Sequence, residues 1–322
     1  MDFVKFGWQG INMELPSTWE LSALSGDYDN GYIRMDDENA PRIELKWSKS
    51  KEKKPDLQKI LDEYFKGMRK RLGQSADGLK IKRNIELVKN EEFFKDRDVV
   101  FYNWKTEVRA NGAIWYCREC KRIVVIQIMG YLKETMLTDT IRILESVHDH
   151  PKGQVNLWSA YQLSVEVPRR YQLDKRKLMS GYLMFSFIDG SRTLSVERFG
   201  LADVILRDAD IQSWFRSYYA KQIRGYGFSF EEDEQSLISN YDNKQKLLGQ
   251  GKRFIDGIPF SPLFVIDKIL RRKQIAACFW HCKESNKIFV VMTISKKGAD
   301  ELVSQVASSI KCHEAVEAQE VT

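Results

Sequence analysis

The sequence has few histidines, prolines and glycines, and it contains no long hydrophobic run. Four histidines, 7 prolines and 19 glycines occur among 322 residues, and 43% of the residues are hydrophobic. This composition is typical of a folded chain and excludes a low-complexity or disordered one. The longest apolar stretch, from Ile123 to Leu132, is interrupted by Gln127 and Gly130 and is much shorter than the ~20 residues that span a bilayer. We therefore expect no membrane-spanning segment.

The cysteines are too few, and odd in number, for a disulfide framework. They are Cys117, Cys120, Cys278, Cys282 and Cys312. The first ten residues, MDFVKFGWQG, lack the basic and apolar regions of a secretory signal, and no Asn-x-Ser/Thr sequon occurs. These features favour reduced thiols and a cytoplasmic location.

The charge balance is mildly basic and unevenly distributed. Lys and Arg number 51 against 45 Asp and Glu, which gives a net charge of +6. Three basic clusters stand out: Lys46, Lys49, Lys51, Lys53 and Lys54; Lys66, Arg69, Lys70 and Arg71; and Arg271, Arg272 and Lys273. Solvated loops and helix faces are the simplest interpretation, but the clusters leave binding of nucleic acid or another polyanion open.

An internal repeat determines the predicted architecture, because four segments recur in the same order about 150 residues later. The matched pairs are 11–21 with 163–173, 31–33 with 181–183, 56–58 with 210–212, and 115–123 with 280–288. Between Leu79 and Asn111 the two copies do not align. We predict two similar domains, residues 1–150 and 155–322, joined by the polar segment from His150 to Gln154.

The hydrophobic spacing within the first copy changes from strands to a helix and back. Alternating residues predict strands at 11–15, 32–35 and 42–47, and later at 99–104, 113–119 and 122–129. A helix is predicted over 56–72, where Leu57, Ile60, Leu61, Tyr64 and Phe65 share one face behind the N-cap Asp56, and another over 138–147. In the second copy the corresponding stripe runs from Ile211 to Tyr226 behind Asp210. The predicted class is α+β: two similar domains, each a mainly antiparallel sheet flanked by helices.

The order of these elements resembles the Mog1/PsbP-like group. The shared features are a Pro-x-x-Trp/Tyr turn after the strand at 11–15, a Gly-Tyr strand, an Ile-x-Leu-x-Trp strand, and an Asp-Leu-x-x-Ile-Leu-x-x-Tyr-Phe helix. The resemblance covers about the first 70 residues of each half and implies an antiparallel sheet sandwiched by helices. Members of the group serve as binding or assembly factors: Mog1 engages a small GTPase, and PsbP docks on photosystem II. A tandem copy departs from the usual single-domain members, and the group offers no catalytic residue to carry over.

The pattern Cys117-Arg-Glu-Cys120 is the strongest local motif, since C-x-x-C can form a redox pair or half of a zinc site. If both cysteines lie in one extended strand, however, their Cα atoms are about 10 Å apart, beyond the ~7 Å limit for a disulfide. The second copy also has Ser285 in place of Cys120. We therefore interpret Cys117 as a small core residue and expect no metal, with a four-cysteine zinc site that adds Cys278 and Cys282 as the alternative.

Other polar motifs predict structure rather than chemistry. The histidines are His148, His150, His281 and His313, of which His150 and His313 follow the last helix of each copy and suit the negative end of a helix dipole. The loop around Gly249 and Gly251 lacks phosphate-loop spacing, and the segment of Asp27, Asp29, Gly31 and Glu38 departs from a calcium loop, so a plain turn is expected there. Trp8 and Trp158, ahead of the first strand of each copy, are expected to pack in the core, with surface anchoring as the alternative.

No convergent set of catalytic side chains is visible, so we predict a non-enzymatic module, without catalytic, cofactor or metal residues, that binds a protein partner. Two alternatives stay open. One is polyanion binding through the basic clusters, which would weaken steeply with salt. The other is an enzyme that uses carboxylates in a cleft between the repeats.

Overall fold

The computed structural model describes residues 2–73, 78–230, 246–252 and 273–311. The chain divides into two compact units, Met1–Tyr161 (the first unit) and Gln162–Thr322 (the second unit). Within the described ranges, no helix has both the length and the apolar character needed to cross a membrane.

The first unit contains ten strands and three helices among its described residues. They are β1 (Phe3–Trp8), β2 (Ile11–Pro16), β3 (Glu20–Gly26), β4 (Asn30–Asp36), β5 (Pro41–Lys49), α1 (Leu57–Leu72), β6 (Lys80–Arg83), α2 (Glu91–Phe94), β7 (Arg97–Lys105), β8 (Val108–Cys117), β9 (Arg122–Tyr131), α3 (Leu137–Ser146) and β10 (Val155–Ala160). Every strand and helix predicted for the first copy is confirmed to within a few residues. The elements β1, β3, β6, α2 and β10 were not predicted.

The second unit repeats this order. Its described elements are β11 (Leu163–Pro168), β12 (Gln172–Met179), β13 (Tyr182–Asp189), β14 (Arg192–Gly200), α4 (Ala202–Ile205), α5 (Ile211–Tyr218), α6 (Ala220–Ile223), β15 (Ser229–Phe230), β16 (Leu247–Lys252), β17 (Gln274–Cys282), β18 (Lys287–Ser295) and α8 (Ala299–Ser308).

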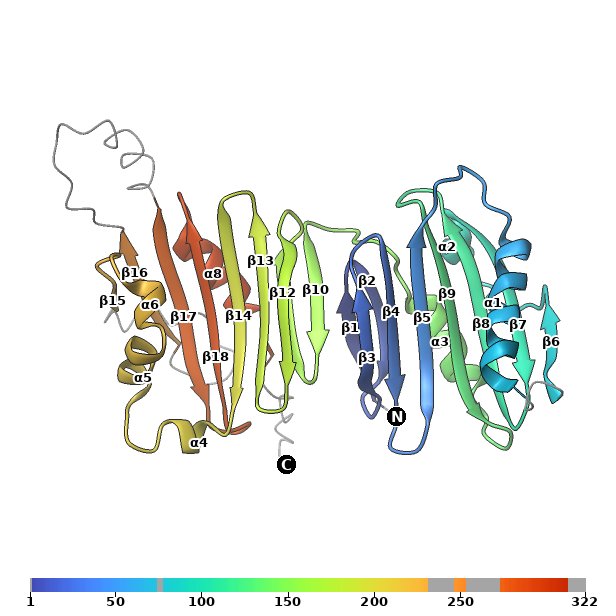
Figure 1. Cartoon of the computed structure of the whole chain (residues 1–322), viewed down its shortest axis with the longest axis horizontal. Coiled ribbons are helices and arrows are strands. Elements are labelled where there is room, and N and C mark those ends of the chain that lie inside the picture. The colour runs from blue at the N-terminus through green and yellow to red at the C-terminus, as the bar shows by residue number, and fades with distance from the viewer. Residues whose placement is uncertain (1, 74–77, 231–245, 253–272, 312–322) are drawn as a thin grey trace, which may run out of the picture. The chain divides into compact units, whose positions relative to one another are not determined.

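Each unit is built on a seven-stranded antiparallel sheet, and the two sheets have the same strand order (Figure 1). The orders are β3-β4-β5-β9-β8-β7-β6 and β12-β13-β14-β18-β17-β16-β15. In each sheet the first three strands form a meander. The third strand then pairs with the last strand of the sheet in the sequence, and the remaining strands follow in reverse sequence order. The prediction of two similar, mainly antiparallel units is therefore confirmed. Among the described residues few helices accompany the sheets, and apart from the 16-residue α1 they have 10 residues or fewer.

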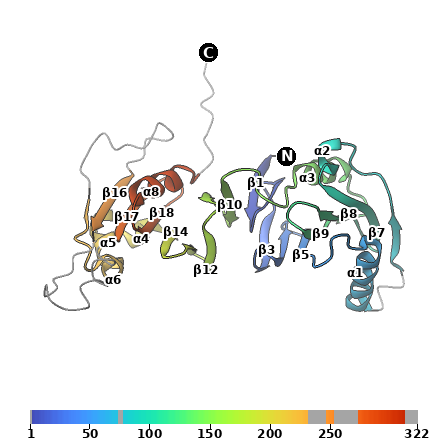
Figure 2. The ribbon, with the colours of Figure 1, turned by 90° about the horizontal axis from the view of Figure 1, so that it is seen from above.

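Helix α1 begins as the sequence predicts and packs on one face of the first sheet. The Asp56 carboxylate accepts hydrogen bonds from the backbone N–H groups of Gln58 and Lys59, which satisfies the free donors of the first turn. Phe65 is fully buried and meets Tyr102 of β7 edge-on, with ring centroids 5.3 Å apart. Figure 2 shows α1 on one side of this sheet and α2 and α3 on the other.

The corresponding helix of the second unit is shorter than predicted. Asp210 caps α5 as Asp56 caps α1, but the helix ends at Tyr218 instead of continuing to Tyr226. Tyr219 turns into the core, where its ring stacks on Phe215 at a centroid distance of 4.7 Å. The expectation of one continuous helix is wrong: a separate short helix, α6, covers Ala220–Ile223, and Gly225, with a φ of 80°, then turns the chain.

Strand β10 packs against β1, which places it in the first unit. The rings of Trp8 and Trp158 meet edge-on at 5.1 Å and are almost completely buried, and the Gly7 N–H donates to Ser159 Oγ at 3.3 Å. Core packing of both tryptophans is confirmed and surface anchoring is wrong. By contacts the first unit ends at Tyr161, and the repeat boundary between residues 150 and 155 stays a prediction.

Candidate functional site

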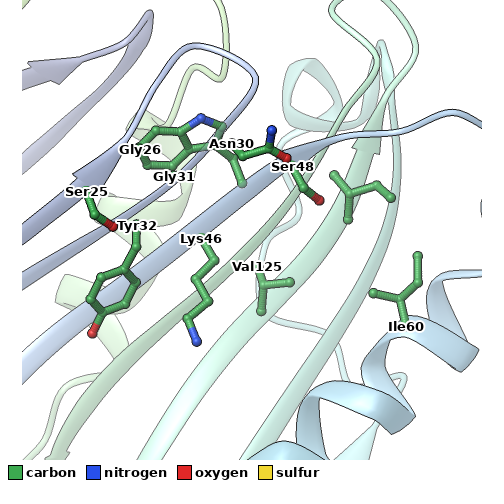
Figure 3. A pocket seen from close by; sticks show the side chains of 11 residues that line it. Ser25, Gly26, Asn30, Gly31, Tyr32, Lys46, Ser48, Ile60 and Val125 are labelled. Atoms are coloured by element: carbon green, nitrogen blue, oxygen red, sulfur yellow. The ribbon is translucent and has the colours of Figure 1, made fainter.

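A cavity of about 490 Å³ opens on the first sheet beside α1 (Figure 3). We call it the Lys46 groove, and the residues that line it are Ser25, Gly26, Asn30, Gly31, Tyr32, Lys46, Trp47, Ser48, Ile60, Ile123 and Val125. They come from β3, β4, β5, β9 and α1. The groove has the size of a small ligand pocket, and its surface combines hydroxyl, amide and ammonium groups with apolar side chains.

Lys46 is the charged residue of the lining. Its ammonium group lies 5.3 Å from the ring centre of Tyr32 and 5.7 Å from that of Tyr64, within the range of cation–π attraction. Burial lowers the pKa of Lys46, and the nearby positive charge of Arg71 lowers it further.

The nearby carboxylate, Glu44, is already engaged by neutral partners. Tyr32 donates its hydroxyl to Glu44 Oε1 at 2.8 Å, and Gln127 Nε2 donates to Oε2 at 2.9 Å. Trp104 in turn donates to the Gln127 carbonyl oxygen at 3.0 Å. Burial raises the pKa of Tyr32, and its hydrogen bond to Glu44 raises it further, so the phenol stays protonated. This chain of hydrogen bonds holds the Tyr32 ring in place.

The strand register identifies the equivalent positions in the second unit. Tyr32 is paired across the ladder with Lys46, and Tyr182 is paired with Phe199. Tyr182 donates to the Glu197 carboxylate at 2.7 Å, as Tyr32 does to Glu44. The second unit thus keeps the tyrosine–glutamate pair but carries an aromatic ring where the first has a lysine.

A second replacement completes the difference. Ile60 is the fourth residue after the cap of α1, and Trp214 is the fourth after the cap of α5. The Phe199 ring meets the rings of Trp214 and Tyr218 edge-on, at centroid distances of 5.1 and 5.2 Å. In the second unit, aromatic rings therefore pack together at the positions where the first unit has Lys46 and Ile60.

The basic clusters are only partly brought together. Lys49 pairs with Asp29 at 3.2 Å, whereas Lys51, Lys53 and Lys54 are exposed in the loop before α1. Of the second cluster, Arg71 acts on Lys46 only through its charge, which lowers the pKa of the lysine. Arg271 and Arg272 lie outside the described residues.

The two cysteines of the C-x-x-C motif lie close together, which corrects the expected separation. Cys117 ends β8 and Cys120 lies in the turn before β9, where Lys121 has a φ of 61°. Because the strand ends at Cys117, the chain folds back instead of extending. One donor atom from each of Cys117, Cys120, Asp149 and His150 lies within 4.8 Å of the others.

His150 belongs to this cluster rather than serving as the expected helix-end cation. Its Nδ1 lies 2.9 Å from Asp149 Oδ1 and 3.5 Å from Cys117 Sγ, and its Nε2 lies 2.9 Å from Glu119 Oε2. The hydrogen bond to Asp149, and then that to Cys117, raises the pKa of His150 to about 10. The hydrogen bond from Cys120, and then that from His150, lowers the pKa of Cys117 to about 5 against the effect of burial.

Two further motifs have structural roles, and the turn predicted at Asp27 is confirmed. Asp27 Oδ1 accepts the backbone N–H groups of Asp29 and Asn30 at 2.9 Å each, which is the plain turn expected there. Gly249 and Gly251 lie within strand β16.

In the second unit, Cys278 and Cys282 are buried in β17, and Cys282 donates to Glu284 Oε2 at 3.4 Å. His148 and His281 have a lowered pKa because of burial. Cys312 and His313 lie outside the described residues.

The chain matches no protein-family profile and no curated protein. Among solved structures, the immunity protein TplEi of the T6SS from Pseudomonas aeruginosa, complexed with "L" peptide, aligns with 96% of this chain and 98% of its own, at 8% identity and a TM-score of 0.27. MucB in complex with MucA(peri) aligns with 95% of this chain and 83% of its own, at 8% identity and a TM-score of 0.20. Likeness at this level carries no argument about fold or function.

Proposed function

We propose that this protein is a non-catalytic binding module, built from two tandem Mog1/PsbP-like repeats, and that the Lys46 groove of the first repeat holds a segment of a protein partner. One observation carries the proposal. The first unit has an open groove lined by Lys46 and Ile60, whereas at the equivalent positions of the second unit the rings of Phe199 and Trp214 pack edge-on.

The lining indicates what kind of segment fits. Trp47, Ile60 and Val125 offer apolar contact, and Lys46 with Arg71 offers positive charge. An acidic side chain flanked by aliphatic residues is complementary to both. The groove admits one or two side chains, so further contacts on the same sheet face would supply the rest of the affinity.

The experiment fills the groove with the residues that the second repeat itself uses. The double variant Ile60→Trp/Lys46→Phe reproduces a pair that already packs in this fold, so we expect the sheet to remain intact. The partner is first captured by a photo-crosslinker at Asn30 and identified by mass spectrometry, and its affinity is then measured with purified proteins.

We expect the double variant to bind the partner at least tenfold more weakly than wild type. Lys66→Phe, at a side chain that is 76% exposed on the outer face of α1, is the matched control for a lost lysine and an added ring. Wild-type affinity in the double variant would remove the groove from the interface.

The same measurements separate the alternatives. Polyanion binding predicts an affinity that falls steeply with salt and depends on Lys51, Lys53 and Lys54 rather than on the groove. An enzyme that uses carboxylates between the repeats predicts turnover that is unaffected when the groove is filled.

A further inference from the structure

We propose that Cys117, Cys120, Asp149 and His150 bind one structural zinc ion in the first unit. This site is separate from the Lys46 groove. It is formed by the turn between β8 and β9 and by the segment that follows α3.

The four donors match zinc in type and spacing. Zinc in proteins takes thiolate, imidazole and carboxylate ligands in a tetrahedron, with bonds of roughly 2.0–2.3 Å, which places neighbouring donor atoms about 3–4 Å apart. Here all four donors lie within 4.8 Å of one another, with 3.5 Å between Cys117 Sγ and His150 Nδ1. Small side-chain movements would close this set around an ion.

The groups around the donors leave the correct atoms facing inward. Glu119 Oε2 lies 2.9 Å from His150 Nε2, which leaves Nδ1 for the metal, as in the carboxylate–histidine–zinc arrangement. Trp115 Nε1 donates to Asp149 Oδ2 at 2.8 Å and leaves Oδ1 on the side of His150.

A buried cation balances the charge of the complete site. Two thiolates and one carboxylate around Zn²⁺ leave one net negative charge. The Arg97 guanidinium lies 3.6 Å from Asp149 Oδ1 and is held over the rings of Phe93 and Trp115, at 4.6 and 5.1 Å. Arg97 supplies the compensating positive charge.

Four protein donors fill the tetrahedron, so the ion has a structural role. It would join the β8–β9 turn to residues 149 and 150, tying the segment between α3 and β10 to the sheet of the first unit. The second unit has Cys282 but Ser285 in place of Cys120, so the described residues predict one zinc per chain.

The first test is the metal content of the full chain, expressed without a metal-binding tag in zinc-supplemented medium and purified under reducing conditions. We expect about one zinc per chain in wild type and in the control Cys278→Ser/Cys282→Ser, and almost none in Cys117→Ser/Cys120→Ser. Cobalt replacement should give the absorption of a tetrahedral thiolate site in wild type and in the control only.

A milder variant keeps the proposal testable if the double cysteine variant does not fold. The Glu119 side chain is 61% exposed, so Glu119→Gln should leave the fold intact while lowering zinc affinity about 10–100-fold, measured by competition with a chromophoric chelator.

Three outcomes would overturn the proposal. These are no zinc uptake by reduced wild type, equal uptake by Cys117→Ser/Cys120→Ser, and wild-type affinity in Glu119→Gln. A Cys117–Cys120 disulfide, detected as a mass lower by two hydrogens, together with no zinc uptake after reduction, would indicate a redox pair instead.

Discussion

Replacing Arg122 with methionine should strongly destabilise the first unit. The side chain is fully buried, and its guanidinium donates to the backbone carbonyls of Gln9 and Asp149 at 2.9 Å each and to that of Tyr28. The same group lies 3.6 Å from the centre of the Tyr28 ring. Burial lowers the pKa of Arg122, and these carbonyls together with the ring compensate for the lost hydration.

The magnitude follows from the groups left without a donor. A buried acceptor that loses its partner costs about 1–3 kcal/mol, and truncating one member of a buried charged network typically costs about 3–5 kcal/mol. With three carbonyls affected, we expect Arg122→Met to lower the free energy of unfolding of the first unit by about 3–5 kcal/mol.

Amide hydrogen exchange measured by mass spectrometry can follow each unit separately within the full chain. Peptides covering β8 and β9 should lose protection by roughly 10²–10³-fold or more, whereas those covering β17 and β18 should change little. The control is Lys287→Met at the equivalent position, where the lysine donates to Gln162 at 3.0 Å in an exposed setting and the expected cost is under about 1 kcal/mol. A loss below about 1 kcal/mol in Arg122→Met would refute the reasoning.

Two further predictions concern the cap of α1 and the acid range. Asp56→Ala should lower the free energy of unfolding by about 1 kcal/mol, because it removes both hydrogen bonds to the first turn of α1. Urea unfolding would detect this loss, and an unchanged midpoint would contradict it. The hydrogen bond from Arg42 lowers the pKa of Glu134 below its ordinary value of 4.5, so this pair stabilises the fold at neutral pH and its contribution is lost as the pH falls below that value. In Arg42→Met the free energy of unfolding should therefore fall less steeply below pH 4.5 than in wild type. The difference should be less than ~1 kcal/mol, because Glu134 is partly exposed. An equally steep fall in both proteins would contradict a stabilising role for the pair.

The architecture was largely predictable because it depends on local periodicity. The apolar stripe from Leu57 to Phe65 predicts which face of α1 is buried, and the recurrence of an Asp cap at Asp56 and Asp210 aligns the two helices. The same alignment explains the Lys46 groove, since Ile60 and Trp214 occupy equivalent positions. The resemblance to the Mog1/PsbP-like group, the partner and the cytoplasmic location stay predictions.

The prediction for the C-x-x-C motif was wrong about spacing because it assumed that one strand continues through Cys120. The positive φ of Lys121 and the return into β9 bring the sulfurs together. The turn lies within the matched segment 115–123 and contains neither Gly nor Pro, so the break between the predicted strands at 119 and 122 did not show how tightly the chain turns. His150 was predicted to lie at a helix end. Its contact with Cys117 was missed because the two residues are far apart in the chain.

The order of strands and helices, the doubled pattern and the caps were determined by residues close to one another in the chain, since backbone conformation and the choice of buried face respond to neighbours a few positions away. The meeting of Cys117 with His150, the burial of Arg122, and the open space beside Lys46 were decided only by tertiary structure. Each of these three features depends on which distant segments pack together and on the volume of the side chains between them. Local spacing in the sequence encodes neither the packing partners nor that volume.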